Sequence, residues 1–186
     1  YAFKGCTGLT AITIPSSVTT IGEHAFEECT GELTIDCNIS DEAFSNSSIT
    51  KLIVGENVTS IGRGAFAGCR YLTDVTFSAA SKLSGIGEVA FCACESLSSI
   101  TIPSGVTSIG IGAFEGCRSL ASVTFPTDPK IASIGEITFS HCESLKSIII
   151  PTSVTSIGDY AFRGCTGLTA ITIPSSVTTI GEHAFE

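Results

Sequence analysis

The chain has 186 residues, of which 9 are basic and 18 are acidic, so its formal net charge is −9 at pH 7. This balance argues against binding to nucleic acid or to an anionic membrane surface, because both need clustered Lys and Arg side chains. The sequence shows neither an apolar run of about 18 residues nor a basic leader followed by an apolar stretch, so we expect no direct membrane insertion of this segment.

The chain is a tandem repeat. Residues 1–27 return at residues 160–186 with one change, Lys4 to Arg163. A phenylalanine marks each unit, and successive phenylalanines are 18 to 25 residues apart. A recurring period of this size is typical of a solenoid, in which each unit buries its apolar face against its neighbours. We expect residues 1–186 to form a single solenoid domain and to be a fragment of a longer array. The marker residues are Phe3, Phe26, Phe44, Phe66, Phe91, Phe114, Phe139, Phe162 and Phe185.

The first complete unit, residues 9–29, shows the consensus LxxIxIPxxVxxIGxxAFxxC. Residues 12–14 alternate apolar and small polar side chains, which predicts a strand with one buried face. Pro15 is expected to end this strand because it has no N–H for the ladder. Residues 18–21 are rich in β-branched side chains and predict a second, short strand. It stops at Gly22, where glycine indicates a positive φ or a close backbone approach.

Residues 23–26 predict a helical turn, with the acidic Glu23 at its N-terminus. The turn is too short to be stable alone, so the packing of Phe26 must hold it. The fold class expected is an α/β repeat solenoid of about eight coils, each made of a strand, a short strand and a helical turn. Neighbouring coils should lie about 4.8 Å apart. The inward-facing positions of the first unit are Leu9, Ile12, Ile14, Val18, Ile21, Ala25, Phe26 and Cys29.

The later units vary in length. The 18-residue unit keeps the first strand, around residues 33–35, but lacks the segment that carries the valine. The two 25-residue units add two residues each, around residues 79–81 and 127–129. Insertions in solenoids usually map to loops, so we expect these additions on the outer edge.

Seven of the nine cysteines follow a marker phenylalanine by three residues. We interpret them as buried, reduced thiols that act as small core residues. Disulfides between adjacent coils remain an alternative, because the coil spacing overlaps the range of about 4.4 to 6.8 Å that a disulfide allows between Cα atoms. Single cysteines in a line do not provide four converging ligands, so we expect no metal and no cofactor. This structural column is Cys6, Cys29, Cys69, Cys94, Cys117, Cys142 and Cys165.

No catalytic constellation stands out. The three histidines are His24, His141 and His183, and nothing places a serine nucleophile beside one of them. The sequence has no G-x-S-x-G elbow, no P-loop and no dinucleotide fingerprint. We therefore expect no catalytic residues and a non-enzymatic segment, while an enzyme domain outside these residues stays an alternative.

The solvated side of the first strand is the candidate site. Two columns of residues line it, and threonine dominates one of them, as β propensity alone would favour. The alternative is a protein-binding surface centred on Glu32, Lys51, Ile53 and Asp74, where the columns vary. An ice-binding face is disfavoured because Ile53 and Ile149 interrupt the threonines. The candidate residues are Thr13, Glu32, Thr34, Lys51, Ile53, Asp74, Thr76, Ser99, Thr101, Ser122, Thr124, Ser147, Ile149 and Thr172.

The consensus resembles the BspA-like, or treponemal-type, leucine-rich repeats, and the resemblance covers essentially all 186 residues. It implies a leucine-rich repeat right-handed superhelix with a parallel sheet on its inner face. Such proteins are found on the surface of host-associated bacteria and some protists, or are secreted by them. The resemblance also implies adhesion to host cells or extracellular-matrix proteins. The 18-residue unit and Ser47, which replaces the cysteine, depart from the pattern.

The leading functional hypothesis is therefore a protein-binding segment of a cell-surface or secreted protein. Its partner would be a host extracellular-matrix or cell-surface protein, not nucleic acid. The alternative is a structural spacer that projects another domain from the surface. The near-identical copies at residues 1–27 and 160–186 favour the spacer, because ligand sites usually diversify repeats.

Overall fold

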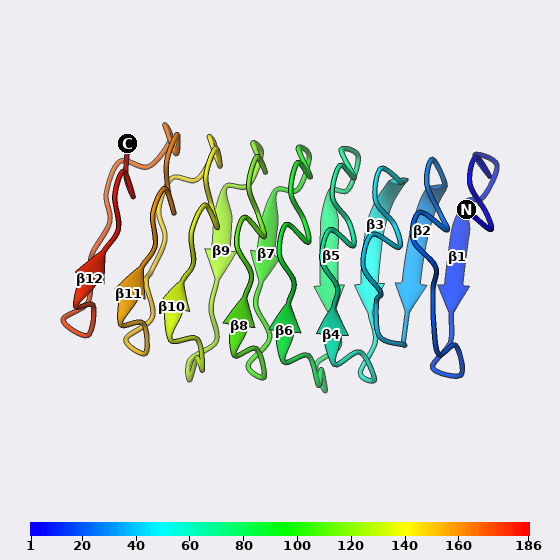
Figure 1. Cartoon of the computed structure of the whole chain (residues 1–186), viewed down its shortest axis with the longest axis horizontal. Coiled ribbons are helices and arrows are strands. Elements are labelled where there is room, and N and C mark those ends of the chain that lie inside the picture. The colour runs from blue at the N-terminus through cyan, green and yellow to red at the C-terminus, as the bar shows by residue number, and fades with distance from the viewer.

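The computed structural model describes residues 1–186. The chain winds into a solenoid of parallel strands with about seven turns. Figure 1 shows the turns stacked along the long axis of the molecule, from β1 near the N-terminus to β12 near the C-terminus. In chain order the strands are β1 (Ala11–Ile14), β2 (Thr30–Ile35), β3 (Ser48–Val54), β4 (Ser60–Ile61), β5 (Asp74–Phe77), β6 (Gly85–Ile86), β7 (Ser99–Thr101), β8 (Ser108–Ile109), β9 (Ser122–Thr124), β10 (Ser133–Ile134), β11 (Ser156–Ile157) and β12 (Thr179–Ile180).

The coils of β3, β5, β7 and β9 each contribute a long strand to one sheet and a short strand, β4, β6, β8 or β10, to another. The longer strands form a four-stranded sheet in the order β1-β2-β3-β5 and a two-stranded sheet of β7 and β9. The short strands form two three-stranded sheets, in the orders β4-β6-β8 and β10-β11-β12. Figure 1 shows the two sets of arrows pointing in opposite directions, as expected when the chain goes out along one side of the coil and returns along the other. The second, short strand expected from the consensus is confirmed from β4 onward. It is wrong for residues 18–21 of the first unit, which form no strand because no preceding coil lies beside them to pair with.

Prolines decide how far the long strands pair. After β2, β3 and β5, the N–H groups of Asp36, Gly55 and Ser78 each donate to a carbonyl of the preceding coil, at 2.7 to 3.0 Å. In the later units a proline follows the strand, and it has no N–H to donate. The long strands accordingly shorten to three residues in β7 and β9. Beyond β9, the long-strand side pairs through one bridge, Ile149 to Thr172.

The expected count of eight coils is not confirmed, since the structure has about seven turns. On the long-strand side six strands form, because the last two units contribute only the single bridge described above. The proline that ends a strand in the consensus therefore also limits the sheet.

The expected helical turn is wrong, because the structure contains no helix. Two residues in each turn, one placed two before the phenylalanine and one two after it, have positive φ, as at His24 (51°) and Glu28 (62°). A right-handed helix needs consecutive negative φ values, so it cannot form there. The turn's N–H groups instead donate to the next coil, as from Phe66 to the Ala90 carbonyl at 2.8 Å. The α/β description is therefore replaced by an all-β solenoid.

The core runs through the whole stack as one cluster of 50 buried residues. The marker phenylalanines form its spine, with neighbouring ring centroids 4.9 to 5.6 Å apart and ring planes within 16° of parallel. Stacked aromatic pairs contribute about 0.5–1.5 kcal/mol beyond their buried area. This spine explains why every unit carries a phenylalanine at the same point.

The glycine that ends the short strand is required by close approach. At Gly110, a Cβ atom would lie 2.4 Å from the backbone nitrogen of Glu88 in the preceding coil. At Gly87 it would lie 2.6 Å from the carbonyl carbon of Gly62. Of the two explanations expected from the sequence, the structure therefore supports close approach at these positions, whose φ values are not positive.

Candidate binding face

The exposed side of the long strands is named here the long-strand face. Strand register brings Ala11, Glu32, Lys51 and Asp74 into one row across β1, β2, β3 and β5. A parallel row contains Thr13, Thr34, Ile53 and Thr76. Both rows continue in the later units through the pairs Ser99–Ser122, Thr101–Thr124 and Ile149–Thr172. The two columns expected from the sequence are therefore real rows on the surface.

Exposure differs along these rows. Thr13, Glu32, Asp74, Thr76, Ser147 and Thr172 are exposed, as are the serines and threonines of β7 and β9, whereas Thr34, Lys51 and Ile53 are half-buried. Ile149 is 85% exposed, which is unusual for a large apolar side chain. The Thr76 hydroxyl donates to the Asp74 carboxylate at 3.5 Å, a long hydrogen bond. The face thus presents mostly hydroxyl groups, with isolated charges and one prominent isoleucine.

A hollow lies where β5, β7 and β9 end, and we call it the β5–β9 depression. Its volume is about 610 Å³. Asp74 and Thr76 line one side, Thr101 and Pro103 lie in the middle, and Thr124 lies on the far side. The partly buried Phe77 and Phe125 also line it and pack against the core. The depression thus combines aromatic rings, hydroxyl groups and one carboxylate.

Phe77 and Phe125 break the pattern of their column. The corresponding residue is Ile14, Ile35 or Val54 in the first three units, and each of these is buried. Ile102 lies in the unit between the two phenylalanines and is 1% exposed. Two large, partly buried rings therefore line the hollow on either side of a smaller, buried residue.

The two-residue insertions lie next to these phenylalanines. Ala79, Ser81 and Thr127, which belong to the insertions expected on the outer edge, line the β5–β9 depression. Sequence reasoning missed this site. The sequence signal that could have revealed the depression is a phenylalanine, Phe77 or Phe125, just before each insertion, where other units have isoleucine or valine.

Two hollows of smaller volume continue along the face. One, of about 310 Å³, lies between Phe125 and Ile149 and shares Thr124 to Thr127 with the β5–β9 depression. The next, of about 470 Å³, lies between residues 147–152 and 170–174. The highly exposed Ile149 lines both hollows. The hollows therefore follow one another along the solenoid axis.

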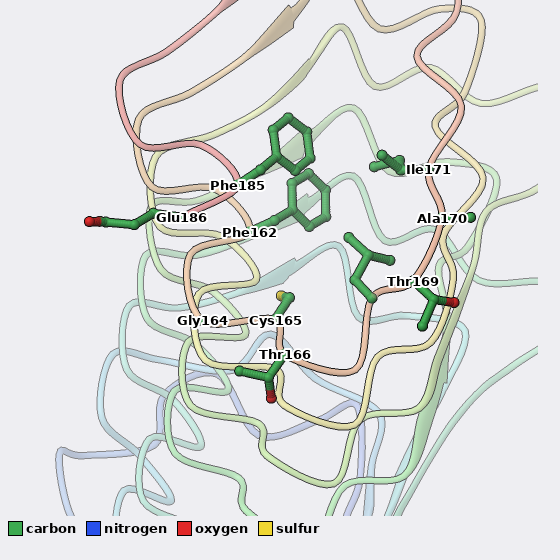
Figure 2. A pocket seen from close by; sticks show the side chains of 10 residues that line it. Phe162, Gly164, Cys165, Thr166, Thr169, Ala170, Ile171, Phe185 and Glu186 are labelled. Carbon is green, nitrogen blue, oxygen red and sulfur yellow. The ribbon is translucent and has the colours of Figure 1, made fainter.

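Hollows at the two ends of the stack have a different origin. Figure 2 shows the C-terminal hollow, of about 430 Å³, with the rings of Phe162 and Phe185 one above the other and Cys165 nearby. The N-terminal hollow, of about 470 Å³, is lined by Phe3, Ile12 and their core neighbours. These side chains belong to the repeat's core columns, so both hollows are cross-sections of the core.

The cysteine column is a ladder of thiols. Cys69, Cys94 and Cys117 donate to phenylalanine carbonyls of the preceding coil at 3.1 to 3.3 Å. Cys29, Cys142 and Cys165 do the same, at 3.0 to 3.3 Å. All nine cysteines are free, and within the column Cys6 is exposed while the others are buried. The structure therefore places all of the column except Cys6 in the core, as expected.

Burial controls the acidity of these thiols. Desolvation raises the pKa of Cys69 to about 12 and that of Cys165 to about 11. Outside the column, burial and the nearby Glu115 carboxylate raise the pKa of Cys92 to about 11. Thiols of this kind are unreactive, because the thiolate is the nucleophile and the metal ligand.

No group of three His, Cys, Asp or Glu side chains is arranged to hold a metal ion. His24 and His183 stack on Tyr1 and Tyr160, with ring centroids 5.6 and 5.2 Å apart.

No helix is present that could cross a lipid bilayer.

Comparison with known protein families shows which family this chain belongs to. The model of the BspA type leucine rich repeat region matches residues 1–85, 37–131 and 84–186, in six copies. The chain belongs to the BspA-type leucine-rich repeat family. Among curated proteins, none matches this BspA-type chain.

Solved structures agree with the family. A leucine-rich repeat protein from Bacteroides ovatus is 32% identical over 92% of this chain and 48% of its own, with a TM-score of 0.79. The T. pallidum leucine-rich repeat protein is 26% identical over 92% of this chain and 72% of its own, with a TM-score of 0.73. The pneumococcal vaccine antigen PcpA shares the fold, at 22% identity over 94% of this chain and 42% of its own, with a TM-score of 0.73. The BspA-type chain thus spans about half the length of the Bacteroides protein.

Proposed function

We propose that this BspA-type segment is a non-enzymatic module that binds a protein partner through its long-strand face. The partner class is a host extracellular-matrix or cell-surface protein, and the parent protein is displayed on a cell surface or secreted. The observation that carries the proposal is the β5–β9 depression, because it is the hollow of this face that two partly exposed phenylalanines line. Partly exposed aromatic side chains such as Phe77 and Phe125 are typical anchors of protein interfaces.

Other features support the same assignment. Exposed Ile149 adds an apolar contact next to the depression. Burial holds the thiol pKa of Cys69 at about 12, which leaves it unsuited to nucleophilic chemistry. The family resemblance supplies the surface location and the adhesive role, since members are surface or secreted proteins associated with adhesion.

The test is a binding panel of purified matrix and host-surface proteins. For a partner that binds, we expect Lys51→Ala combined with Asp74→Ala to weaken affinity at least tenfold. The matched control is Ser133→Ala combined with Ser156→Ala on β10 and β11, on the opposite side of the coil, and it should leave affinity unchanged. Equal loss in both double variants would place the binding surface elsewhere.

The second candidate is a spacer. It is favoured by the near identity of residues 1–27 and 160–186, which a ligand-binding face would be expected to diversify. A spacer predicts that neither double variant alters any function of the parent protein. Loss of adhesion by cells carrying the Lys51 and Asp74 substitutions would exclude it.

A further inference from the structure

We infer that the β5–β9 depression binds an extended, proline-rich segment in the polyproline II conformation, with a basic residue next to its prolines. This inference rests on the proposed function and names the chemistry of the partner. The first argument for it is spacing. Phe77 and Phe125 lie two coils apart, on either side of Ile102. Stacked parallel strands are about 4.8 Å apart, so two coils span about 9.6 Å.

A polyproline II helix repeats every three residues with a rise of about 3.1 Å per residue, so one turn is about 9.3 Å long. A ligand lying along the solenoid axis would place residues i and i+3 against the two phenylalanines, because one turn of polyproline II is nearly as long as the distance between two coils. In a β-strand, side chains on one face recur every 6.6 to 6.8 Å or so, which fits neither one coil nor two. The spacing of the rings therefore favours polyproline II over a strand.

The lining of the depression has the matching chemistry. Aromatic grooves recognise prolines because the rigid ligand loses little conformational freedom on binding. A polyproline II backbone has no internal hydrogen bonds, so its carbonyl groups need donors. The exposed hydroxyls of Thr101 and Thr124, which line the same depression, can supply them.

Charge selects the residue that flanks the prolines. Asp74 lies exposed at the β5 side of the depression, and the chain as a whole carries a net charge of −9. The Asp74 carboxylate makes only the long hydrogen bond from Thr76, so it is available to a cationic partner. Arginine is the better match, because its guanidinium group binds carboxylates through two parallel hydrogen bonds.

Residues at the same position in other units indicate substitutions that should not disturb the fold. Isoleucine occupies the column of Phe77 and Phe125 at Ile14, Ile35 and Ile102, where it is buried. Phe77→Ile combined with Phe125→Ile should therefore keep the solenoid intact while removing both rings from the depression. The thermal midpoint of the double variant should lie within a few degrees of that of the parent chain, which checks that it folds.

The experiment measures fluorescence anisotropy of a labelled nine-residue peptide with proline at every third position and one arginine. We expect saturable binding, at least tenfold weaker for the Phe77→Ile, Phe125→Ile variant. A peptide with glycine in place of each proline should also bind at least tenfold more weakly, because it is not pre-organised. Asp74→Asn should weaken the arginine peptide several-fold and leave a glutamine-substituted peptide unaffected. Ser133→Ala, on β10 on the opposite side of the coil, is the control and should change nothing.

Two results would overturn the inference. One is that the proline and glycine peptides bind equally or not at all while a protein partner still depends on Lys51 and Asp74; the proposed function then stands without it. The other is that peptide binding survives in the folded Phe77→Ile, Phe125→Ile variant. If neither the peptides nor the panel of proteins binds, both proposals fall together.

Discussion

Left-handed residues beside each phenylalanine set the shape of the turn, and the side chains that adopt this conformation differ widely. Two before the phenylalanine, the unit with Phe66 has Gly64, whereas the unit with Phe91 has Val89 at φ 47°. A β-branched side chain in this region is strained, while glycine is not. Some units therefore carry a conformational cost that others avoid.

Val89→Gly should raise the free energy of unfolding by about 0.5–1 kcal/mol, because relief of the left-handed strain exceeds the lost packing of a half-buried valine. The reverse change, Gly64→Val, should lower it by about 1–2 kcal/mol. Urea denaturation of both variants beside the parent chain measures the difference. Destabilisation by Val89→Gly would show that packing outweighs backbone strain at this position.

The thiol ladder makes the fold sensitive to alkali. Burial raises the pKa of Cys69 from 9.0 to about 12, so this thiol stays neutral in the folded chain. In the unfolded chain it ionises above about pH 9, and the unfolded state then binds fewer protons than the folded state. The stabilisation is complete below pH 9 and is lost as the pH rises from there towards 12, at about 1.4 kcal/mol per pH unit for each such thiol.

Urea denaturation between pH 7 and pH 10.5 should therefore show stability falling steeply above pH 9. Cys69→Ser is the informative variant, because Ser47 already occupies this column in a natural unit and is 2% exposed. It should flatten the slope above pH 9 by the contribution of one thiol. An unchanged slope would mean that Cys69 does not contribute to the pH dependence.

At the scale of the element, the 18-residue unit is short of backbone, and its side chains accept hydrogen bonds that backbone carbonyls accept in the other units. Ile35 pairs with Val54 and Ile39 pairs with Ile61, so three residues cover a path that takes six in the next coil. The Asn38 carboxamide oxygen accepts hydrogen bonds from the Thr59 N–H at 2.8 Å and its hydroxyl at 2.9 Å. A third comes from the Ser60 N–H at 3.3 Å. Side-chain acceptors thus continue the ladder where the chain is too short.

Asn38→Ala should lower the free energy of unfolding by about 1–2 kcal/mol, because three donors of the next coil lose their partner and are left to solvent. Glu56→Ala, an exposed position in that next coil, is the control and should stay within about 0.5 kcal/mol of the parent chain. Chemical denaturation of the two variants provides the comparison. Equal effects would mean that water replaces the Asn38 amide without loss.

The sequence predicted the elements that depend on local side-chain pattern. Alternation around Ile12 to Ile14 and the glycine at Gly22 were enough to place the long strand of the early units, the short strand of the units from β4 onward, and the core. The prediction of a helical turn was wrong, because Glu23 and Ala25 are compatible with a helix and only the glycines at the position of His24 in other units, such as Gly64, signal a left-handed φ. That conformation is imposed by hydrogen bonds to the next coil, which are invisible to a reading of one unit.

Part of the candidate site could also be predicted from the repeat pattern. Strand register follows from the repeat, so the rows containing Thr13 and Asp74 could be read from the alignment of units. The β5–β9 depression could not, because its lining comes from side chains of three neighbouring coils and from both insertions. Only the structure shows that the two insertions lie beside it.

For the molecule as a whole, stacking governs stability more than surface charge does. The phenylalanine spine is continuous through eight contacts, from Phe3 to Phe185. The turns also carry exposed ion pairs between coils, each of which contributes about 0–1 kcal/mol. They are Arg63–Glu88, Arg70–Glu95, Arg118–Glu143 and Arg163–Glu186, with N–O distances of 3.3 to 3.7 Å. Coils that interact only with their neighbours should be removable one at a time.

Deletion of residues 92–114 removes one whole period and joins Phe91 to Glu115 in register. The shortened chain should fold cooperatively, with a urea m-value lower by about a tenth because less surface is exposed on unfolding. Its circular dichroism spectrum should stay that of a β protein. Deletion of residues 92–103, about half a period, should instead unfold the chain, because it brings non-equivalent faces together.

The same deletion also tests the site, because it removes β7 with Ile102 and places the coils of Phe77 and Phe125 next to each other. The spacing between the rings falls from two coils to one, or about 4.8 Å, which no longer matches a turn of polyproline II. The folded deletion variant should therefore no longer bind the proline peptide, although it retains both aromatic residues. Retained peptide binding would show that the rings act independently, and the match between coil spacing and ligand repeat would then be irrelevant to recognition.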